Sequence, residues 1–169
     1  YGRNSLGEVL RETSKNIFVP ITVGGGIRTL NDGYKILAAG ADKIAINSSV
    51  VKDYTLIKKM SEIFGKQCLV LSIQAKRNHL MQSGWEIMIE SGRQKTDLDL
   101  LSWINKVQDC GIGELLITSV DQDGTKKGPD KNLLEILNKK VNVPLIFGGG
   151  INDKKQVLEI FKKDYVSAI

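Results

Sequence analysis

The chain has 169 residues, 41% of them hydrophobic and 25% charged, a composition typical of one folded domain rather than of disordered, collagen-like or coiled-coil proteins. The 24 basic and 19 acidic residues give a net charge of +5, but only 6% of residues are aromatic and no stripe mixes basic with stacking residues, so no nucleic-acid partner is expected. No stretch approaches the roughly 20 apolar residues of a membrane span, so no membrane partner is expected either.

The two cysteines, Cys68 and Cys110, form no CxxC pair, and the chain has a single histidine. This usage predicts neither a disulfide framework nor a metal site, and it fits a protein of the reducing cytoplasm. We expect no metal and no cofactor.

Along the chain, short β-rich runs alternate with amphipathic stretches. Strands are expected at 19–23, 43–46, 68–73, 114–118 and 144–147, and helices at 30–39, 53–64, 99–110, 132–138 and 153–161. The run 68–73 is apolar almost throughout, which is typical of a parallel strand covered on both faces. Alternation with short connections predicts an α/β fold with a parallel sheet.

One long connection, between residues 73 and 99, interrupts this alternation. It contains an alternating strand-like piece at 85–89, which predicts a hairpin over the mouth of the sheet. Connections of this length in a compact domain are usually functional.

The chain also repeats itself. Residues 19–27 return as residues 143–151 with six of nine positions identical. A period this long excludes a solenoid. It indicates two half-barrels of common origin, each contributing about four βα units to an eight-stranded barrel.

Each repeat ends in a glycine triplet directly after a strand, at 24–26 and at 148–150. Without side chains, the backbone N–H groups at such a turn can approach an anion, although glycines also serve tight turns. Two copies half a barrel apart predict two anion sites facing each other across one mouth. Residues 47–49 follow the next strand and could complete the first site, and residues 121–125 could complete the second. A small molecule with a phosphate at each end is the expected ligand.

Several segments in the order found here resemble the cyclase subunit of imidazole glycerol phosphate synthase. They are Thr22-Val23-Gly24-Gly25-Gly26-Ile27-Arg28, Gly40-Ala41-Asp42-Lys43, Ile46-Asn47-Ser48, Ala75-Lys76-Arg77, Trp85-Glu86, Ser91-Gly92-Arg93, and Gly113-Glu114 through Ser119 into Asp121-Gln122-Asp123-Gly124-Thr125-Lys126. A sister family, the phosphoribosyl isomerase of the same pathway, shares the glycine triplets and an Asp-Gly-Thr motif. The Lys76-Arg77 pair, the Trp85 hairpin and Gly113-Glu114 favour the cyclase branch.

The resemblance implies a (βα)8 TIM barrel of roughly 250 residues. Residues 1–169 would then be a single partial barrel domain that covers about strands 3 to 8. The chain begins at Tyr1 without a methionine and ends in a strand-like run, 165–169, so we expect it to be truncated at both ends.

The resemblance also implies roles for individual residues. One substrate phosphate would be bound by Gly25, Gly26, Asn47 and Ser48, and the other by Asp123, Gly124, Thr125, Gly149 and Gly150. Lys43 and Glu114 would lie at the entrance for ammonia, and Asp42 would face a glutaminase subunit with which the chain forms a heterodimer. Ordinary solvated charges are the alternative for these three residues.

The catalytic centre departs from the family. A family Asp-Ala-Lys-Arg motif carries one of two acid/base aspartates, and here it reads Gln74-Ala75-Lys76-Arg77. An amide cannot exchange a proton near neutral pH, and such catalysis contributes about 10²–10⁴-fold. Gln74 can still orient a ligand by hydrogen bonding, and we expect it to act with Thr118 and Asp123.

Three interpretations remain open. The first, which we favour, is a cyclase-like subunit that delivers ammonia to a different acceptor, as in the amination of surface-polysaccharide (lipopolysaccharide) sugars. The second is a working lyase of histidine biosynthesis, which would use ammonia and a bisphosphorylated substrate to form imidazole glycerol phosphate and AICAR. The third is a non-catalytic partner that only activates the glutaminase.

Overall fold

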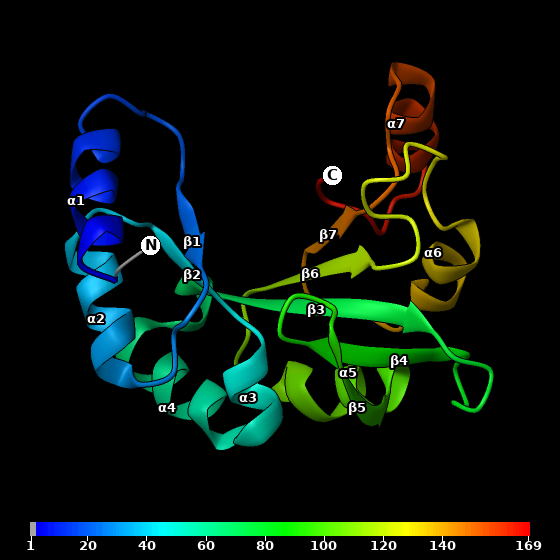
Figure 1. The fold of residues 1–169 in the computed structure, drawn as a ribbon, viewed down its shortest axis with the longest axis horizontal. Helices are drawn as coiled ribbons and strands as arrows, with labels where there is room; N and C mark the ends of the chain where they lie inside the picture. Colours follow the sequence, from blue (N-terminus) through cyan, green and yellow to red (C-terminus); the bar gives the residue numbers. More distant parts are fainter. Residues whose placement is uncertain (1–2) are drawn as a thin grey trace.

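The computed structural model describes residues 3–169, and Tyr1 and Gly2, where the chain begins, lie outside this part (Figure 1). Its strands are β1 (Thr22–Gly24), β2 (Lys43–Ile46), β3 (Leu69–Arg77), β4 (Trp85–Ile89), β5 (Gln94–Asp99), β6 (Glu114–Ser119) and β7 (Leu145–Gly148). Its helices are α1 (Arg3–Ser14), α2 (Leu30–Ala38), α3 (Ser48–Lys52), α4 (Thr55–Phe64), α5 (Leu100–Val107), α6 (Lys131–Leu137) and α7 (Lys154–Phe161), with short 3₁₀ turns at Lys66–Cys68 and Gln108–Cys110.

The centre of the sheet is β3, which is longer than the strands around it. Its first residues pair in parallel with β2, and its middle pairs in parallel with β6. The parallel strands follow the order β1, β2, β3, β6, β7. The predicted α/β fold with a parallel sheet is therefore confirmed, and the carboxyl ends of these five strands lie along one edge.

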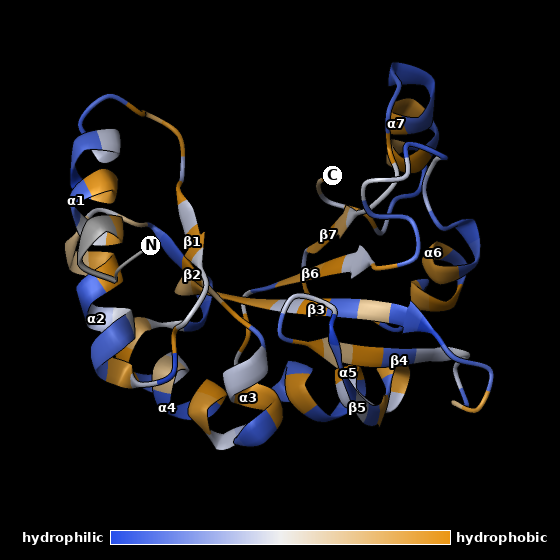
Figure 2. Ribbon diagram, viewed as in Figure 1, coloured by the Kyte–Doolittle hydropathy of each residue, from blue (hydrophilic) through white to orange (hydrophobic). Residues whose placement is uncertain are grey.

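The sheet is curved, and Figure 1 shows α2, α4, α5, α6 and α7 along its outer side. Strand residues that face these helices are buried, including Ile44, Leu71, Ile73, Ile117 and Phe147. Apolar faces of the helices pack against them (Figure 2). Within the described part of the chain, no helix covers the concave inner face.

The connection between β3 and α5 forms the predicted hairpin, because β4 and β5 pair antiparallel. The hairpin also extends the main sheet, since β4 pairs antiparallel with the last residues of β3, from Gln74 to Arg77. Because β6 occupies the other edge of β3 at Gln74 and Ala75, β4 continues along the edge that β2 leaves. The turn of the hairpin therefore returns to the carboxyl end of β2.

Some predicted boundaries were wrong. The first strand starts at Thr22 rather than at residue 19, where Pro20 lacks an N–H group and Val19 is 68% exposed. The helix expected at 99–110 ends at Val107 and continues as a 3₁₀ turn. Helices α1 and α3 were not predicted. At the other end of the chain, the expected strand is reduced to a single parallel bridge between Ala168 and Ile146.

Among residues 3–169, no helix has both the length and the hydrophobicity that crossing a bilayer requires.

Candidate functional site

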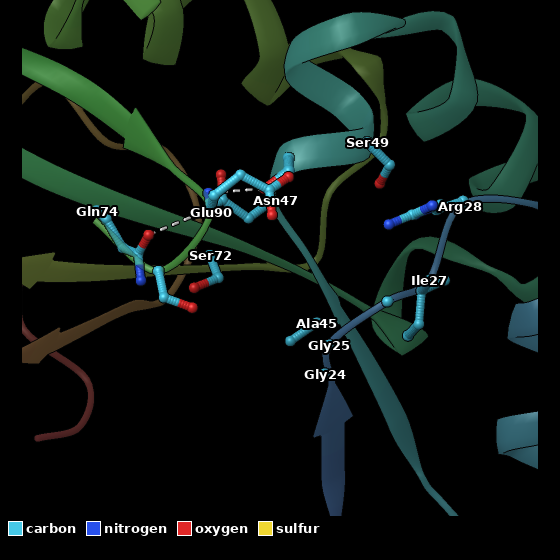
Figure 3. Close-up of a pocket in the computed structure, with 13 residues that line it drawn as sticks. Gly24, Gly25, Ile27, Arg28, Ala45, Asn47, Ser49, Ser72, Gln74 and Glu90 are labelled. Atoms are coloured by element: carbon cyan, nitrogen blue, oxygen red, sulfur yellow. Dashed lines mark hydrogen bonds between the residues drawn. The ribbon is translucent and has the colours of Figure 1, made fainter. Parts of the chain in front are cut away.

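A cavity of about 320 Å³ opens at the carboxyl ends of β1, β2 and β3. Figure 3 shows its polar side chains converging from these strands and from the turn of the hairpin. It is lined by Gly24, Gly25, Gly26, Ile27, Arg28, Ala45, Asn47, Ser48, Ser49, Ser72, Gln74, Glu90 and Ser91. The four residues predicted for the first phosphate site are thus brought together. Ligands of open α/β sheets bind at this edge.

The glycine triplet forms the floor of the cavity. Gly25 and Gly26 have φ angles of 104° and 70°, a region that residues with a side chain rarely adopt. A Cβ atom added to either would meet nothing within 4 Å. The space above both residues is therefore open, and a ligand can approach their backbone.

Three polar residues after β2 form the adjacent wall. The Ser48 hydroxyl oxygen accepts a hydrogen bond from the Glu90 N–H group at 3.2 Å, which leaves its own O–H group available as a donor. The Ser49 hydroxyl oxygen is buried without a hydrogen-bond partner. Buried polar atoms without a partner are uncommon in folded proteins, and a bound ligand is one way to satisfy them.

Gln74 lies in the same cavity. Its side chain accepts a hydrogen bond from the Asn47 amide at 3.3 Å, and it shares the inner face of β3 with Ser72. Thr118 is its direct neighbour on β6. Asp123 lies on an exposed loop after β6 and donates its backbone N–H group to Ser119. Gln74 and Thr118 are therefore adjacent, and the group beside Thr118 is an amide rather than a carboxylate.

The second triplet is closely packed rather than open. A Cβ atom on Gly149 would lie 2.8 Å from the Ser119 carbonyl oxygen, and one on Gly150 would collide with the Gly128 carbonyl oxygen. The Gly128 N–H group donates to the Gly150 carbonyl oxygen at 2.8 Å. These contacts bring the loop 121–128, which contains the predicted Gly124 and Thr125, against the triplet.

Ion pairs and hydrogen bonds hold the hairpin and this loop in place. Arg77 contacts both carboxylate oxygens of Asp130 and lies over the Trp85 ring, while its backbone N–H group donates to Asp121 at 2.7 Å. Asp121 is thus engaged in a structural contact.

Glu86 anchors the hairpin from inside. It is 1% exposed and accepts hydrogen bonds from Asn78 and from the backbone N–H groups of Thr96 and Asp97. Burial alone would raise the pKa of Glu86, but these hydrogen bonds outweigh it and hold the pKa below its ordinary value.

At the opposite end of the strands, Lys43 pairs with Glu114 across the start of β3. Their side chains are 26% and 19% exposed, and the alternation of burial along β2 and β6 places both on the concave face. Asp42 accepts the Ile21 N–H group at 2.8 Å, which gives it a structural role beside any contact with a partner.

Four lining residues with polar side chains were not predicted as site residues: Arg28, Ser72, Glu90 and Ser91. Arg28 lies two positions after the last glycine of the triplet, and Ser72 precedes Gln74 by two strand positions, so sequence spacing could have pointed to both. Glu90 and Ser91 reach the cavity only through the register of the hairpin.

The sequence matches the family model described as "Histidine biosynthesis protein" over residues 1–169. The chain belongs to this family. It is 46% identical to the imidazole glycerol phosphate synthase subunit HisF of Legionella pneumophila over 151 residues, which are 89% of this chain and 70% of that protein. The HisF subunit of Clostridium botulinum (strain Okra / Type B1) is 46% identical over 167 residues, 99% of this chain and 66% of the relative. The HisF subunit of Hydrogenobaculum sp. (strain Y04AAS1) is 45% identical over 166 residues, 98% of this chain and 65% of the relative.

These matches confirm the resemblance to the cyclase subunit of imidazole glycerol phosphate synthase that the sequence motifs indicated. The chain spans about two thirds of the length of these relatives.

Proposed function

We propose that this chain forms the phosphate-binding and ammonia-using part of a cyclase subunit of the imidazole glycerol phosphate synthase type. The observation that carries the proposal is the cavity above Gly25 and Gly26. Open space over two glycines with positive φ, beside the unpartnered Ser49 hydroxyl, is the arrangement that a phosphate requires. The enzyme class follows from the HisF subunits to which the chain is similar.

The curved sheet is proposed to be five strands of an eight-stranded barrel. Its two outer strands, β1 and β7, carry the two copies of the internal repeat, and all helices that pack on the sheet lie on its convex side. In a closed barrel the two triplets would face each other across one mouth. A second phosphate would then lie near Gly124, Thr125, Gly149 and Gly150, with Asp123 beside it.

Ammonia is proposed to enter at the opposite end, between Lys43 and Glu114, and to travel along the inner face of the sheet toward Gln74. A glutaminase subunit would dock at that end, and Asp42 would lie near its edge. Support comes from the placement of the ion pair on the concave face, at the amino ends of β2 and β6.

A second candidate, ammonia transfer to a sugar of a surface polysaccharide, is favoured by one observation. The position at which the family carries an acid/base aspartate holds the Gln74 amide, whose oxygen is engaged by Asn47. The names of the relatives favour the histidine pathway instead. A purely activating partner of the glutaminase would have no use for an open phosphate cavity.

The deciding experiment is complementation of a bacterial strain that lacks its histidine-pathway cyclase. Growth without histidine on the wild-type gene would establish the first function. Growth on the Gln74→Asp variant alone, with both proteins soluble at equal levels, would show that proton transfer at this position has been lost and would favour the second. If neither restores growth, assays of the purified proteins with ammonium and the bisphosphorylated substrate test the chemistry directly, and an inactive wild type then excludes the first function.

A further inference from the structure

The cavity contains one carboxylate that the proposed phosphate site does not use. Among its thirteen lining residues, only Arg28 and Glu90 carry a charge. In Figure 3, Arg28 lies with Ser49 on one side, while Glu90 lies with Gln74 and Asn47 on the other. A negative side chain beside an anion site weakens the binding of a bare phosphate. The cavity is therefore suited to a ligand with an anionic end and a separate end that donates hydrogen bonds.

Glu90 is held at this position by its own backbone. Its N–H group donates to the Ser48 hydroxyl oxygen at 3.2 Å, and the Arg93 N–H group closes the turn onto the Ile89 carbonyl oxygen at 3.1 Å. Strand β4, which precedes Glu90, is buried throughout. The hairpin thus presents Glu90 to the cavity from a well-packed support.

The backbone conformation of the turn is unfavourable for these residue types. Glu90 and Ser91 have φ angles of 50° and 59°, where glycine and asparagine are the usual residues. Non-glycine residues in this region cluster at ligand sites, where the surrounding structure maintains them. A glutamate in such a turn points to a role for its side chain.

The carboxylate is also free to accept hydrogen bonds. Within the described residues, it forms no ion pair and no hydrogen bond, and the hydrogen bond between Glu90 and Ser48 is made by the Glu90 backbone. Nearby, the hydroxyl groups of Ser72 and Ser91 and the amide of Gln74 line the same space. Alternating acceptors and donors of this kind recognise a polyol.

We propose that Glu90 is a ligand-binding residue that accepts hydrogen bonds from hydroxyl or amino groups next to the bound phosphate. The site would thereby select a sugar phosphate over inorganic phosphate. This inference rests on the proposed phosphate-binding function and adds the chemistry of the ligand's second end.

The test compares two probes, ribose 5-phosphate and inorganic phosphate, by titration calorimetry on the purified protein. Glu90→Gln is expected to lower the affinity for ribose 5-phosphate about fivefold or more, since hydrogen bonds to a charged group are lost. Its affinity for inorganic phosphate should stay the same or rise, because a like charge is removed. Glu62→Gln, the same change on an exposed face of α4, is the control and should alter neither affinity.

A second variant separates a lost contact from a folding defect. Glu90→Gly should keep or raise the melting temperature, because glycine suits a φ of 50°, and it should still lose the preference for ribose 5-phosphate. Equal changes in both affinities, or no change, would overturn the role of Glu90 while leaving the phosphate site intact. If wild type binds neither probe, the phosphate site and the inference built on it both fail.

Discussion

The guanidinium group of Arg77 contacts both carboxylate oxygens of Asp130, at 3.0 and 3.1 Å. Asp130 is buried and also accepts the Leu133 N–H group at 3.1 Å, so it caps α6 as well. A single nitrogen, Nη2, makes both contacts, and this charge-assisted hydrogen bonding is stronger than bonding between neutral groups. It joins the end of β3 to the start of α6 and thereby holds the intervening loop, 121–128, beside the mouth of the sheet.

Substitution of Arg77 and substitution of Asp130 should destabilise the protein by different amounts. Arg77→Lys keeps the charge but loses the planar guanidinium that contacts Asp130 and lies over the Trp85 ring, and we expect it to lower the free energy of unfolding by about 1 kcal/mol. Asp130→Ala also removes the helix cap and should cost about 2 kcal/mol or more. Urea unfolding measures both, with Arg11→Lys on the exposed face of α1 as the control. Equal losses would show that the cap contributes nothing.

A negative charge at the floor of the cavity should abolish phosphate binding. Gly25→Asp places a carboxylate where the space is open, so we expect a modest loss of stability from the positive φ, about 1 kcal/mol. The rise in melting temperature with ribose 5-phosphate should disappear through like-charge repulsion. Gly7→Asp, on α1 where a Cβ atom also meets nothing, is the control. A ligand-induced shift in melting temperature that persists in Gly25→Asp would show that the glycine triplet forms a turn and does not bind phosphate.

The buried Glu86 makes the free energy of unfolding depend on pH. Its pKa is lowered in the folded protein from an ordinary value of 4.5, so its contribution is complete above about pH 4.5 and is lost as the pH falls through the folded value. Glu86→Gln should cost about 1–3 kcal/mol at pH 7, because an amide N–H group then faces one of the donors that the carboxylate accepted from, Asn78 or the backbone of Thr96 and Asp97. The difference between variant and wild type should narrow toward pH 3 in urea unfolding curves. A difference independent of pH would refute the lowered pKa, and Glu62→Gln serves as reference.

The ion pair between Lys43 and Glu114 should affect the delivery of ammonia rather than the affinity for the phosphate ligand. Each of Lys43→Met and Glu114→Gln should leave the affinity for ribose 5-phosphate unchanged, since the cavity lies at the other end of the strands. Glutamine-dependent turnover with the glutaminase should fall more than turnover with added ammonium. The coupling between the two residues in unfolding experiments should be small, about 1 kcal/mol. Equal effects on both nitrogen sources would argue against an entrance at this pair.

Much of the parallel sheet could be predicted from the sequence because its strands are short apolar runs between amphipathic helices. The first phosphate site could be predicted for a related reason. Gly25 and Asn47 each follow a strand directly, and parallel strands end at one edge. Identical triplets, however, gave no indication that Gly149 is closely packed whereas Gly25 is open.

Other features depend on contacts between distant segments. Strand β3 extends to Arg77 only because β4 pairs with it, and no local pattern extends an apolar run into Lys76 and Arg77. Glu90 reaches the cavity through the same pairing. A charged residue in a long connection usually belongs to a solvated loop, so the residue type alone did not indicate a place in the cavity.

The double pairing of β3 also gives the cavity walls of unequal stiffness. The backbone at Gln74 and Ala75 is bonded to β4 on one edge and β6 on the other, whereas β1 pairs over three residues with β2 alone among the described strands. Amide hydrogens of β3 should therefore exchange with solvent far more slowly than those of β1. A ligand that bridges the two walls would slow exchange mainly at Val23 and Gly24, so the glycine side of the cavity is where occupancy can be read in solution.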